Sequence, residues 1–169
     1  MNSRVFGFAG YSGSGKTTLI EQMIPRLVET GLSVSLIKHA HHSFDIDQPG
    51  KDSWRHREAG AGEVLISSGQ RWVLMHEVRD GVEPSLDEQL QRLSPCDLVL
   101  IEGFKHASVP KIEVHRHSVG KPLLWPVDSN IVAVASDEAL QTPLPRLDLN
   151  DPAAVAQFVV KYLEISNEK

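Results

Sequence analysis

The chain has 169 residues, the length of one ordinary domain and enough to bury a single substantial core. Hydrophobic residues make up 41% of the chain and charged residues 23%, and this near-average composition excludes wholesale disorder. The net charge of −5 argues against general nucleic-acid binding, which usually needs a basic face.

The sequence also indicates the compartment in which the protein acts. Cys96 is the single cysteine, so no disulfide can form within the chain. No apolar run approaches the length of a membrane span, and the N-terminal residues lack the apolar region of a signal peptide. We therefore expect a cytoplasmic protein that binds neither membranes nor nucleic acid.

Strand-like and helix-like segments alternate in the first half of the chain. Residues 5–9 form a short apolar run that predicts a buried strand, and apolar residues recur at helical spacing over residues 16–28. Pro25 lies inside this helical pattern and predicts a kink or an early end. Residues 34–38 predict a second strand, and the polar residues 38–52 predict an ordered loop.

The second half continues this alternation. Ser85 with Glu88 makes a capping box for a helix that ends near residue 93. Asn150 or Asp151 caps a last helix, with Pro152 at its first position. The other predicted elements are a short helix capped by Asp52 or Ser53, strands over 64–67, 72–76, 98–101 and 131–135, and an edge strand over 111–115.

These elements predict one α/β domain over residues 1–169, with a mostly parallel sheet flanked by helices. Residues 10–17, G-Y-S-G-S-G-K-T, match the P-loop pattern in full between a strand and a helix, so we expect a P-loop NTPase fold. Lys16 should bridge the terminal phosphates, and the Thr17 hydroxyl should ligate Mg²⁺. The predicted nucleotide-binding residues are Gly10, Ser12, Gly13, Ser14, Gly15, Lys16, Thr17 and Thr18.

A P-loop needs a carboxylate at the end of a neighbouring strand to complete the Mg²⁺ shell or to order the attacking water. Glu102 follows the apolar residues 98–101 and should lie at the carboxyl end of that strand, where ligands gather in open α/β sheets. Asp97 precedes the same strand and should lie at the opposite edge. We therefore assign the catalytic and metal-binding carboxylate to Glu102, with Lys16 as the second catalytic residue.

The loop after the second strand is rich in His and Asp and should lie at the same edge of the sheet. Asp47, or alternatively Asp45 or Asp52, could join the Mg²⁺ shell, and we assign the metal site to Thr17, Glu102 and Asp47. A transition-metal site on His39, His41 and His42 is an alternative, although their spacing fits no standard zinc pattern. A polar switch loop that orders on nucleotide binding is the favoured interpretation. Lys38, His39 or Lys51 could touch phosphate.

No Asn-Lys-x-Asp motif of Ras-like GTPases occurs in this sequence. Asp137 follows a predicted buried strand and could read the base in place of that motif, or it could be an ordinary turn aspartate. Composition and spacing alone do not distinguish guanine from adenine.

The combination of motifs resembles the MobB family of molybdopterin-guanine dinucleotide biosynthesis accessory proteins. The resemblance rests on the phosphate loop, on Lys38–His39 with Asp47, on the Gly-Lys-Asp-Ser segment at 50–53 with Arg57, Ala59 and Gly60 after it, and on the Glu-Gly-Phe-Lys segment at 102–105. It implies a fold of the class that includes nitrogenase iron protein and dethiobiotin synthetase, which often works as dimers. It further implies GTP as the nucleotide, weak hydrolysis, and a partner in the guanylyltransferase that joins GMP to molybdopterin, with other molybdenum cofactor proteins.

Two other functions stay open on the sequence. The same loop could serve a small-molecule kinase that uses ATP, although no arginine-rich lid segment is present. A binding module for molybdopterin could use the cationic residues Lys105, His106, Lys111, Arg116 and His117. Arg55 and Arg57 are candidate arginine fingers for hydrolysis. For a homodimer, the candidate surfaces are Trp72 and the predicted edge strand over 111–115.

Overall fold

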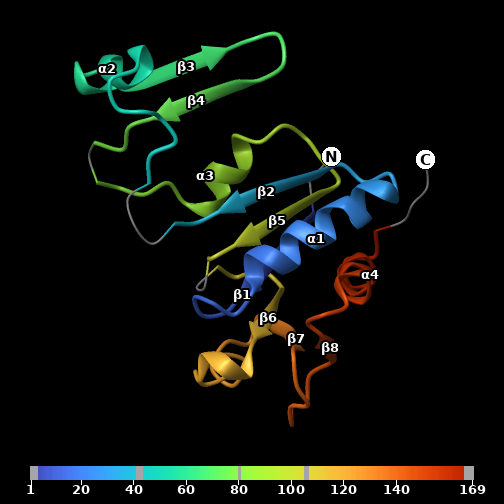
Figure 1. Cartoon of the computed structure of the whole chain (residues 1–169). Coiled ribbons are helices and arrows are strands. Elements are labelled where there is room, and N and C mark those ends of the chain that lie inside the picture. Colours follow the sequence, from blue (N-terminus) through green and yellow to red (C-terminus); the bar gives the residue numbers. More distant parts are fainter. Residues whose placement is uncertain (1–3, 41–43, 80, 105–106, 166–169) are drawn as a thin grey trace. The chain divides into compact units, whose positions relative to one another are not determined.

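The computed structural model describes residues 4–40, 44–79, 81–104 and 107–165 (Figure 1). Its contacts divide the chain into two compact units, one formed by Met1–His39 with Gln91–Lys169 and the other by Ala40–Leu90. The prediction of one domain over 1–169 stays a prediction. Within the described residues, no helix combines the length and hydropathy that crossing a membrane requires.

The first unit contains a six-stranded sheet in which every neighbouring pair of strands is parallel. The order is β2-β5-β1-β6-β7-β8. Parallel strands need crossover connections, which explains the alternation of strands with helices in the sequence. This architecture confirms the predicted α/β P-loop fold. The strands are β1 (Arg4–Ala9), β2 (Val34–Lys38), β5 (Leu98–Glu102), β6 (Lys111–His115), β7 (Ile131–Ser136) and β8 (Arg146–Asp148).

Helices α1 (Lys16–Glu29) and α4 (Pro152–Tyr162) pack against each other and share one hydrophobic core with the sheet. The periodic apolar residues of α1 are buried in this core, as its helical spacing predicts. The predicted cap of α4 is confirmed, because Asp151 Oδ1 accepts a hydrogen bond from the Ala154 N–H at 3.0 Å and Pro152 begins the helix. The strand residues in the core come from alternate positions: Phe6, Phe8, Leu98, Leu100, Ile112, Val114, Ala133 and Ala135.

Of the two outcomes predicted for Pro25, the early end of α1 is wrong, because the helix continues to Glu29, and the kink stays a prediction. Proline lacks the N–H that would bond to the carbonyl four residues earlier, that of Glu21. Both Pro25 and Glu21 are exposed, so water can satisfy this carbonyl. The helix ends where Gly31 takes a φ of 90° and donates its N–H to the Val28 carbonyl.

The prediction that residues 111–115 form an edge strand was also wrong. Strand β6 lies between β1 and β7, and its polar residues Lys111 and Glu113 are both only 1% exposed. Lys111 Nζ donates to Asp128 Oδ2 at 3.0 Å, and the Glu113 carboxylate accepts the N–H groups of Leu124 and Trp125 at 2.7 and 3.0 Å. These buried charges fix the loop after β6 through their hydrogen bonds. In the sequence, their alternation with apolar residues resembles the pattern of a half-exposed strand, which explains the wrong prediction.

Buried charges in this region have shifted pKa values. Burial raises the pKa of the Glu113 carboxyl, and the N–H groups of Leu124 and Trp125 partly offset the rise. Burial also acts to raise the pKa of Asp128, but the hydrogen bonds from Lys111 and from the backbone and side chain of Asn130 together outweigh it, so that pKa is lowered. The short edge strand β8 follows this region and was not predicted.

The second unit contains a two-stranded antiparallel sheet of β3 (Glu63–Ser67) and β4 (Trp72–His76), with α2 (Asp52–Glu58) in contact with β3. Lys51, rather than Asp52 or Ser53, is the N-cap of α2, because the Ser53 hydroxyl instead donates to Asp47. Helix α3 (Leu86–Gln91) ends slightly before the predicted residue 93. Its predicted capping box is confirmed, since the Glu88 N–H donates to Ser85 Oγ at 3.3 Å and the Ser85 N–H donates to Glu88 Oε2 at 2.8 Å.

Candidate nucleotide-binding site

Residues 10–17 join β1 to α1 and form a turn that depends on glycine. Gly10, Gly13 and Gly15 have φ angles of 148°, 81° and 95°, in the region that L side chains rarely adopt. A β-carbon built at Gly10 would lie 2.5 Å from the Val114 carbonyl oxygen of β6. Gly15 is the N-cap of α1 and gives it no side-chain cap, an arrangement in which the first backbone N–H groups of a helix can bind an anion.

Lys16 lies over this loop. Its Nζ donates to the carbonyl oxygens of Gly10 and Tyr11, each at 2.9 Å. The ammonium group is therefore held within the concave side of the loop, where an anion bound by the backbone N–H groups would meet it. An anion with several oxygens can replace the two carbonyls as acceptors for this ammonium group.

Thr17 and Glu102 are 85 positions apart in the chain and meet at the carboxyl edge of the sheet. The Thr17 hydroxyl donates to Glu102 Oε1 at 2.7 Å, and Lys38 Nζ lies 3.6 Å from Glu102 Oε2. Strand β5 places Glu102 there because it lies between β1 and β2 in parallel register. Asp97 lies before β5 and accepts hydrogen bonds from the N–H and hydroxyl of Ser33, away from this group.

The oxygen atoms of Thr17 and Glu102 fit a hard divalent cation such as Mg²⁺. Glu102 is only 6% exposed, and its carboxylate lies beside the positive end of α1. In the described ranges, no three or more His, Cys, Asp or Glu side chains are grouped so that they could hold a metal ion. Mg²⁺ does not need such a group, because it usually keeps several waters and binds one or two carboxylates together with substrate phosphates.

The His-rich loop falls partly outside the described residues, which leave out His41 and His42. His39 follows β2, and its ring packs against Phe104 at a centroid distance of 4.9 Å. A transition-metal role for the three histidines stays a prediction. Gly103, with a φ of 99°, brings these two segments together, since a β-carbon at this position would lie 2.8 Å from the His39 carbonyl oxygen.

An arginine lies on the other side of the phosphate loop. Arg116, directly after β6, places its Nη2 3.3 Å from a β-carbon built at Gly15. Its Nη1 lies 3.3 Å from Asp137 Oδ2, while Asp137 Oδ1 accepts the His117 N–H at 3.1 Å. Of the other cations expected to hold a pterin, Lys111 is buried and paired with Asp128, which removes it from any ligand surface.

Of the remaining three, Lys105 and His106 lie outside the described residues, and His117 Nδ1 lies 2.8 Å from Glu138 Oε1. From the sequence, Arg116 was expected among the cations that could hold molybdopterin beside the P-loop. The structure places it beside Gly15, because it is the first residue after β6, which pairs with the P-loop strand β1.

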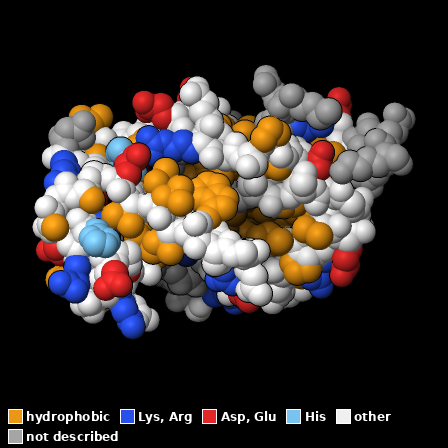
Figure 2. All heavy atoms as spheres, turned by 90° about the horizontal axis from the view of Figure 1, so that it is seen from above, with side chains coloured by type: hydrophobic (Ala, Val, Ile, Leu, Met, Phe, Trp, Pro, Cys, Tyr) orange, Lys and Arg blue, Asp and Glu red, His pale blue; other side chains and the backbone are white. Residues whose placement is uncertain are grey.

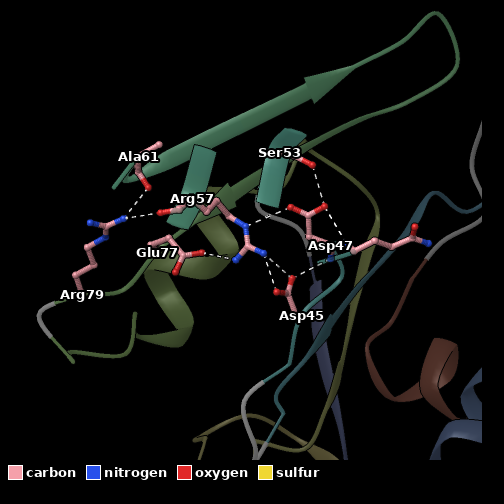
Figure 3. A network of polar contacts seen from close by, with 8 residues as sticks. Asp45, Asp47, Ser53, Arg57, Ala61, Glu77 and Arg79 are labelled. Carbon is pink, nitrogen blue, oxygen red and sulfur yellow. Dashed lines mark hydrogen bonds and ion pairs between the residues drawn. The ribbon is translucent and has the colours of Figure 1, made fainter. Parts of the chain in front are cut away.

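Asp47 belongs to the second unit, where Arg57 is the centre of a polar network (Figure 3). Arg57 Nε lies 3.4 Å from Asp47 Oδ2, its Nη2 lies 2.7 Å from Asp45 Oδ2, and its Nη1 lies 2.8 Å from Glu77 Oε1. Asp47 Oδ1 also accepts the hydroxyl of Ser53 at 2.8 Å. The network thus ties the loop before α2 to this helix and to the segment after β4.

Charge pairing in this network shifts two pKa values. The hydrogen bond from Arg57, followed by the Asp47 N–H, lowers the pKa of the Asp45 carboxyl. The pKa of Arg57 is raised, chiefly by its hydrogen bonds to Glu77 and Asp45. The Arg57 guanidinium is therefore paired with three carboxylates. The roles of Asp47 as a metal ligand and of Arg57 as an arginine finger stay predictions.

The comparison with known proteins agrees with this architecture. Residues 5–137 match the family model described as "MobB: Molybdopterin guanine dinucleotide synthesis protein B". The chain belongs to the MobB family. It is 43% identical over 166 residues to the molybdopterin-guanine dinucleotide biosynthesis adapter protein of Escherichia coli strain K12, with 96% of this chain and 95% of the relative covered.

A second relative and a solved structure extend the comparison. The adapter protein of Haemophilus influenzae is 42% identical, with 96% of this chain and 92% of the relative covered. A crystal structure of molybdopterin-guanine biosynthesis protein B superimposes with a TM-score of 0.76 at 31% identity, and covers 94% of this chain and 99% of that one. The family resemblance expected from the motifs is therefore confirmed.

The close approach of β6 to the loop predicts the effect of Gly10→Ala. The added methyl group would meet the Val114 carbonyl at 2.5 Å and the Ser14 hydroxyl at 2.8 Å, so the loop must shift. We expect the free energy of unfolding, measured by denaturant titration, to fall by about 1–3 kcal/mol. Gly69→Ala is the control, because nothing lies within 4 Å of a β-carbon there. Equal stability of the two variants would contradict this account of the loop.

Proposed function

We propose that the chain binds GTP with Mg²⁺ on the loop 10–17, hydrolyses it slowly, and acts as an adapter in the assembly of molybdopterin guanine dinucleotide in the cytoplasm. The observation that carries the nucleotide proposal is the hydrogen bond from Thr17 to Glu102 beside a complete phosphate loop. Membership of the MobB family and two relatives named as adapter proteins, each more than 40% identical, support the adapter role.

The phosphate loop would bind the triphosphate mainly through its backbone. The N–H groups of residues 12–18 would donate to phosphate oxygens, with the positive end of α1 directed at the same anion. Lys16 would exchange its two carbonyl acceptors for oxygens of the terminal phosphates. The Thr18 hydroxyl would bond an inner phosphate, and Ser14 and Gly15 would contribute backbone contacts.

Thr17 and Glu102 would hold Mg²⁺, which when bound supplies charge neutralisation at the terminal phosphates. For hydrolysis, a carboxylate would also have to order the attacking water. Glu102 already accepts the Thr17 hydroxyl on Oε1, and its Oε2 lies 3.6 Å from the Lys38 ammonium, so both carboxylate oxygens have partners. This engagement supports slow turnover, in which the positioning of phosphates by the loop provides most of the rate enhancement.

Removing the Lys16 ammonium tests nucleotide binding. We expect purified wild type with Mg²⁺ to prefer GTP to ATP, and Lys16→Ala to lose at least about tenfold in GTP affinity and to lose hydrolysis. Isothermal titration of both nucleotides and phosphate release measure the two effects. Lys121→Ala, at an exposed position, is the control. Unchanged GTP hydrolysis in Lys16→Ala would sink the proposal, and a clear ATP preference would favour a small-molecule kinase.

The adapter role requires a physical partner. We propose the guanylyltransferase that joins GMP to molybdopterin, because both relatives are named for this biosynthesis. The expected result is that the two purified proteins form one complex at micromolar concentrations, measured by sedimentation velocity with and without GTP. An unrelated nucleotide-binding protein of similar size serves as the control. Independent sedimentation under both conditions would count against the adapter role.

We also propose that the chain forms a homodimer. The β3–β4 hairpin exposes Leu65, Trp72 and Leu74 by 59, 66 and 45%, and these residues share one face because Leu65 pairs with Leu74 and Ser67 with Trp72. Figure 2 shows hydrophobic side chains gathered on the molecular surface among charged ones. An exposed apolar sheet face of this kind is typical of an interface. The other candidate surface, residues 111–115, is excluded by the burial of β6.

Substituting Trp72 tests this dimer. We expect wild type to sediment with the mass of two chains and Trp72→Ser to shift toward the mass of one, because loss of the indole removes a large apolar contact. Val127→Ser, at a site 87% exposed in the other unit, is the control and should leave the mass unchanged. A wild-type mass of one chain at micromolar concentration would end the claim.

A further inference from the structure

A polar hollow separate from the phosphate loop lies in the first unit, at the carboxyl ends of β7 and β8. Its volume is about 280 Å³, which suits a small flat group. The lining combines charged and amide groups with two apolar side chains. The lining residues are Ser136, Asp137, Glu138, Ala139, Arg146, Leu147, Asp148 and Asn150.

Strand order places this hollow on one definite side of the phosphate loop. The loop follows β1, and β7 and β8 lie two and three strands away, roughly 10 and 14 Å across the sheet. Glu102 and Lys38 lie on the opposite side, on β5 and β2. Since Thr17 and Glu102 would hold Mg²⁺ against the terminal phosphates, the rest of the nucleotide must extend toward β6, β7 and β8.

Arg116 and Asp137 join the loop to the hollow. The Arg116 guanidinium lies beside Gly15 at one end, and its ion pair with Asp137 at 3.3 Å reaches a residue of the hollow at the other end. The Arg116 side chain thus covers the path between a phosphate on the loop and a base in the hollow. Its positive charge along this path suits the inner phosphates.

The polar groups of the hollow favour guanine over adenine. The edge of guanine that carries N1 and N2 presents adjacent N–H donors, which one carboxylate can accept together, whereas N1 of adenine is itself an acceptor. Among the described residues, Asp148 is the carboxylate of the hollow that forms no ion pair. Asp137 already accepts from Arg116 and His117, and Glu138 pairs with His117 at 2.8 Å.

Asp148 in turn uses its Oδ1 to accept the Asn150 N–H at 2.8 Å, a bond that fixes the carboxylate at the end of β8. Within the described part of the chain, the hollow is no metal site, because no suitable group of His, Cys, Asp or Glu occurs. Ala139 and Leu147 supply apolar contacts for the faces of a planar ring.

We propose that this hollow is the base subsite of the nucleotide and that the Asp148 carboxylate reads guanine through its N1 and N2 donors. The proposal rests on the proposed binding of GTP by the phosphate loop and adds the residue that sets the preference for guanine. Asp137 and Arg116 act as positioning residues between the two parts of the site.

An exchange of the base together with Asp148 tests the assignment. In Asp148→Asn, the new amide N–H₂ faces the N2 donors of guanine but complements the carbonyl that xanthine carries at this position. We expect the affinity for GTP, measured by isothermal titration, to fall about tenfold or more and the affinity for xanthosine triphosphate to rise above that of wild type. Affinity for inorganic tripolyphosphate should stay unchanged, which reports that the loop is intact. Asp87→Asn, in the first turn of α3, is the control.

The outcomes separate this inference from the function on which it rests. If wild type binds GTP and tripolyphosphate but Asp148→Asn binds GTP as wild type does, the base assignment is wrong and the nucleotide proposal stands. If wild type binds neither compound, both fail. If Asp148→Asn loses affinity for both GTP and tripolyphosphate, the assignment is also overturned, because the effect would then lie in the phosphate loop.

Discussion

The close approach of strand β6 to the phosphate loop is the constraint on which the site depends. The Val114 carbonyl leaves no room for a side chain at Gly10, and the chain turns there with a φ of 148°, which glycine adopts without strain. That turn directs the following N–H groups inward and starts α1 at Gly15. Arg116 follows directly after this strand, so the strand that shapes the loop also places a cation beside it.

Strand β6 can take this central place because its charges are satisfied inside the protein. Burying an unpaired ammonium or carboxylate would lower the free energy of unfolding by several kcal/mol, because the ion loses its hydration. Lys111 is paired with Asp128, and Glu113 accepts two backbone N–H groups of the loop that follows. These contacts of Lys111 and Glu113 therefore order the loop over residues 117–130. The loop in turn leads into β7, which pairs with β6.

The sequence was most informative where local chemistry alone decides the structure. The glycine pattern of the loop, the caps of α3 and α4 and the acidic end of β5 each depend on neighbouring residues, and each was predicted. The central position of β6 was not predicted. The alternation of Lys111 and Glu113 with apolar residues is the same in a half-exposed strand as in a buried strand whose charges have partners elsewhere in the chain. Strand β8 has only three residues, too few to show a period. Asp148 at its end was not singled out for that reason.

Arg57 illustrates how pairing limits what a carboxylate can bind. Its guanidinium is shared among Asp45, Asp47 and Glu77, so each carboxylate already has a cation. A metal ion that takes Asp47 must compete with this arginine, whose Nε lies 3.4 Å from Asp47 Oδ2. Binding of a cation at Asp47 would therefore weaken the tie between the loop before α2 and the segment after β4. Glu102 differs, because its lysine partner lies 3.6 Å away and is largely exposed, which leaves that carboxylate the more available of the two for Mg²⁺.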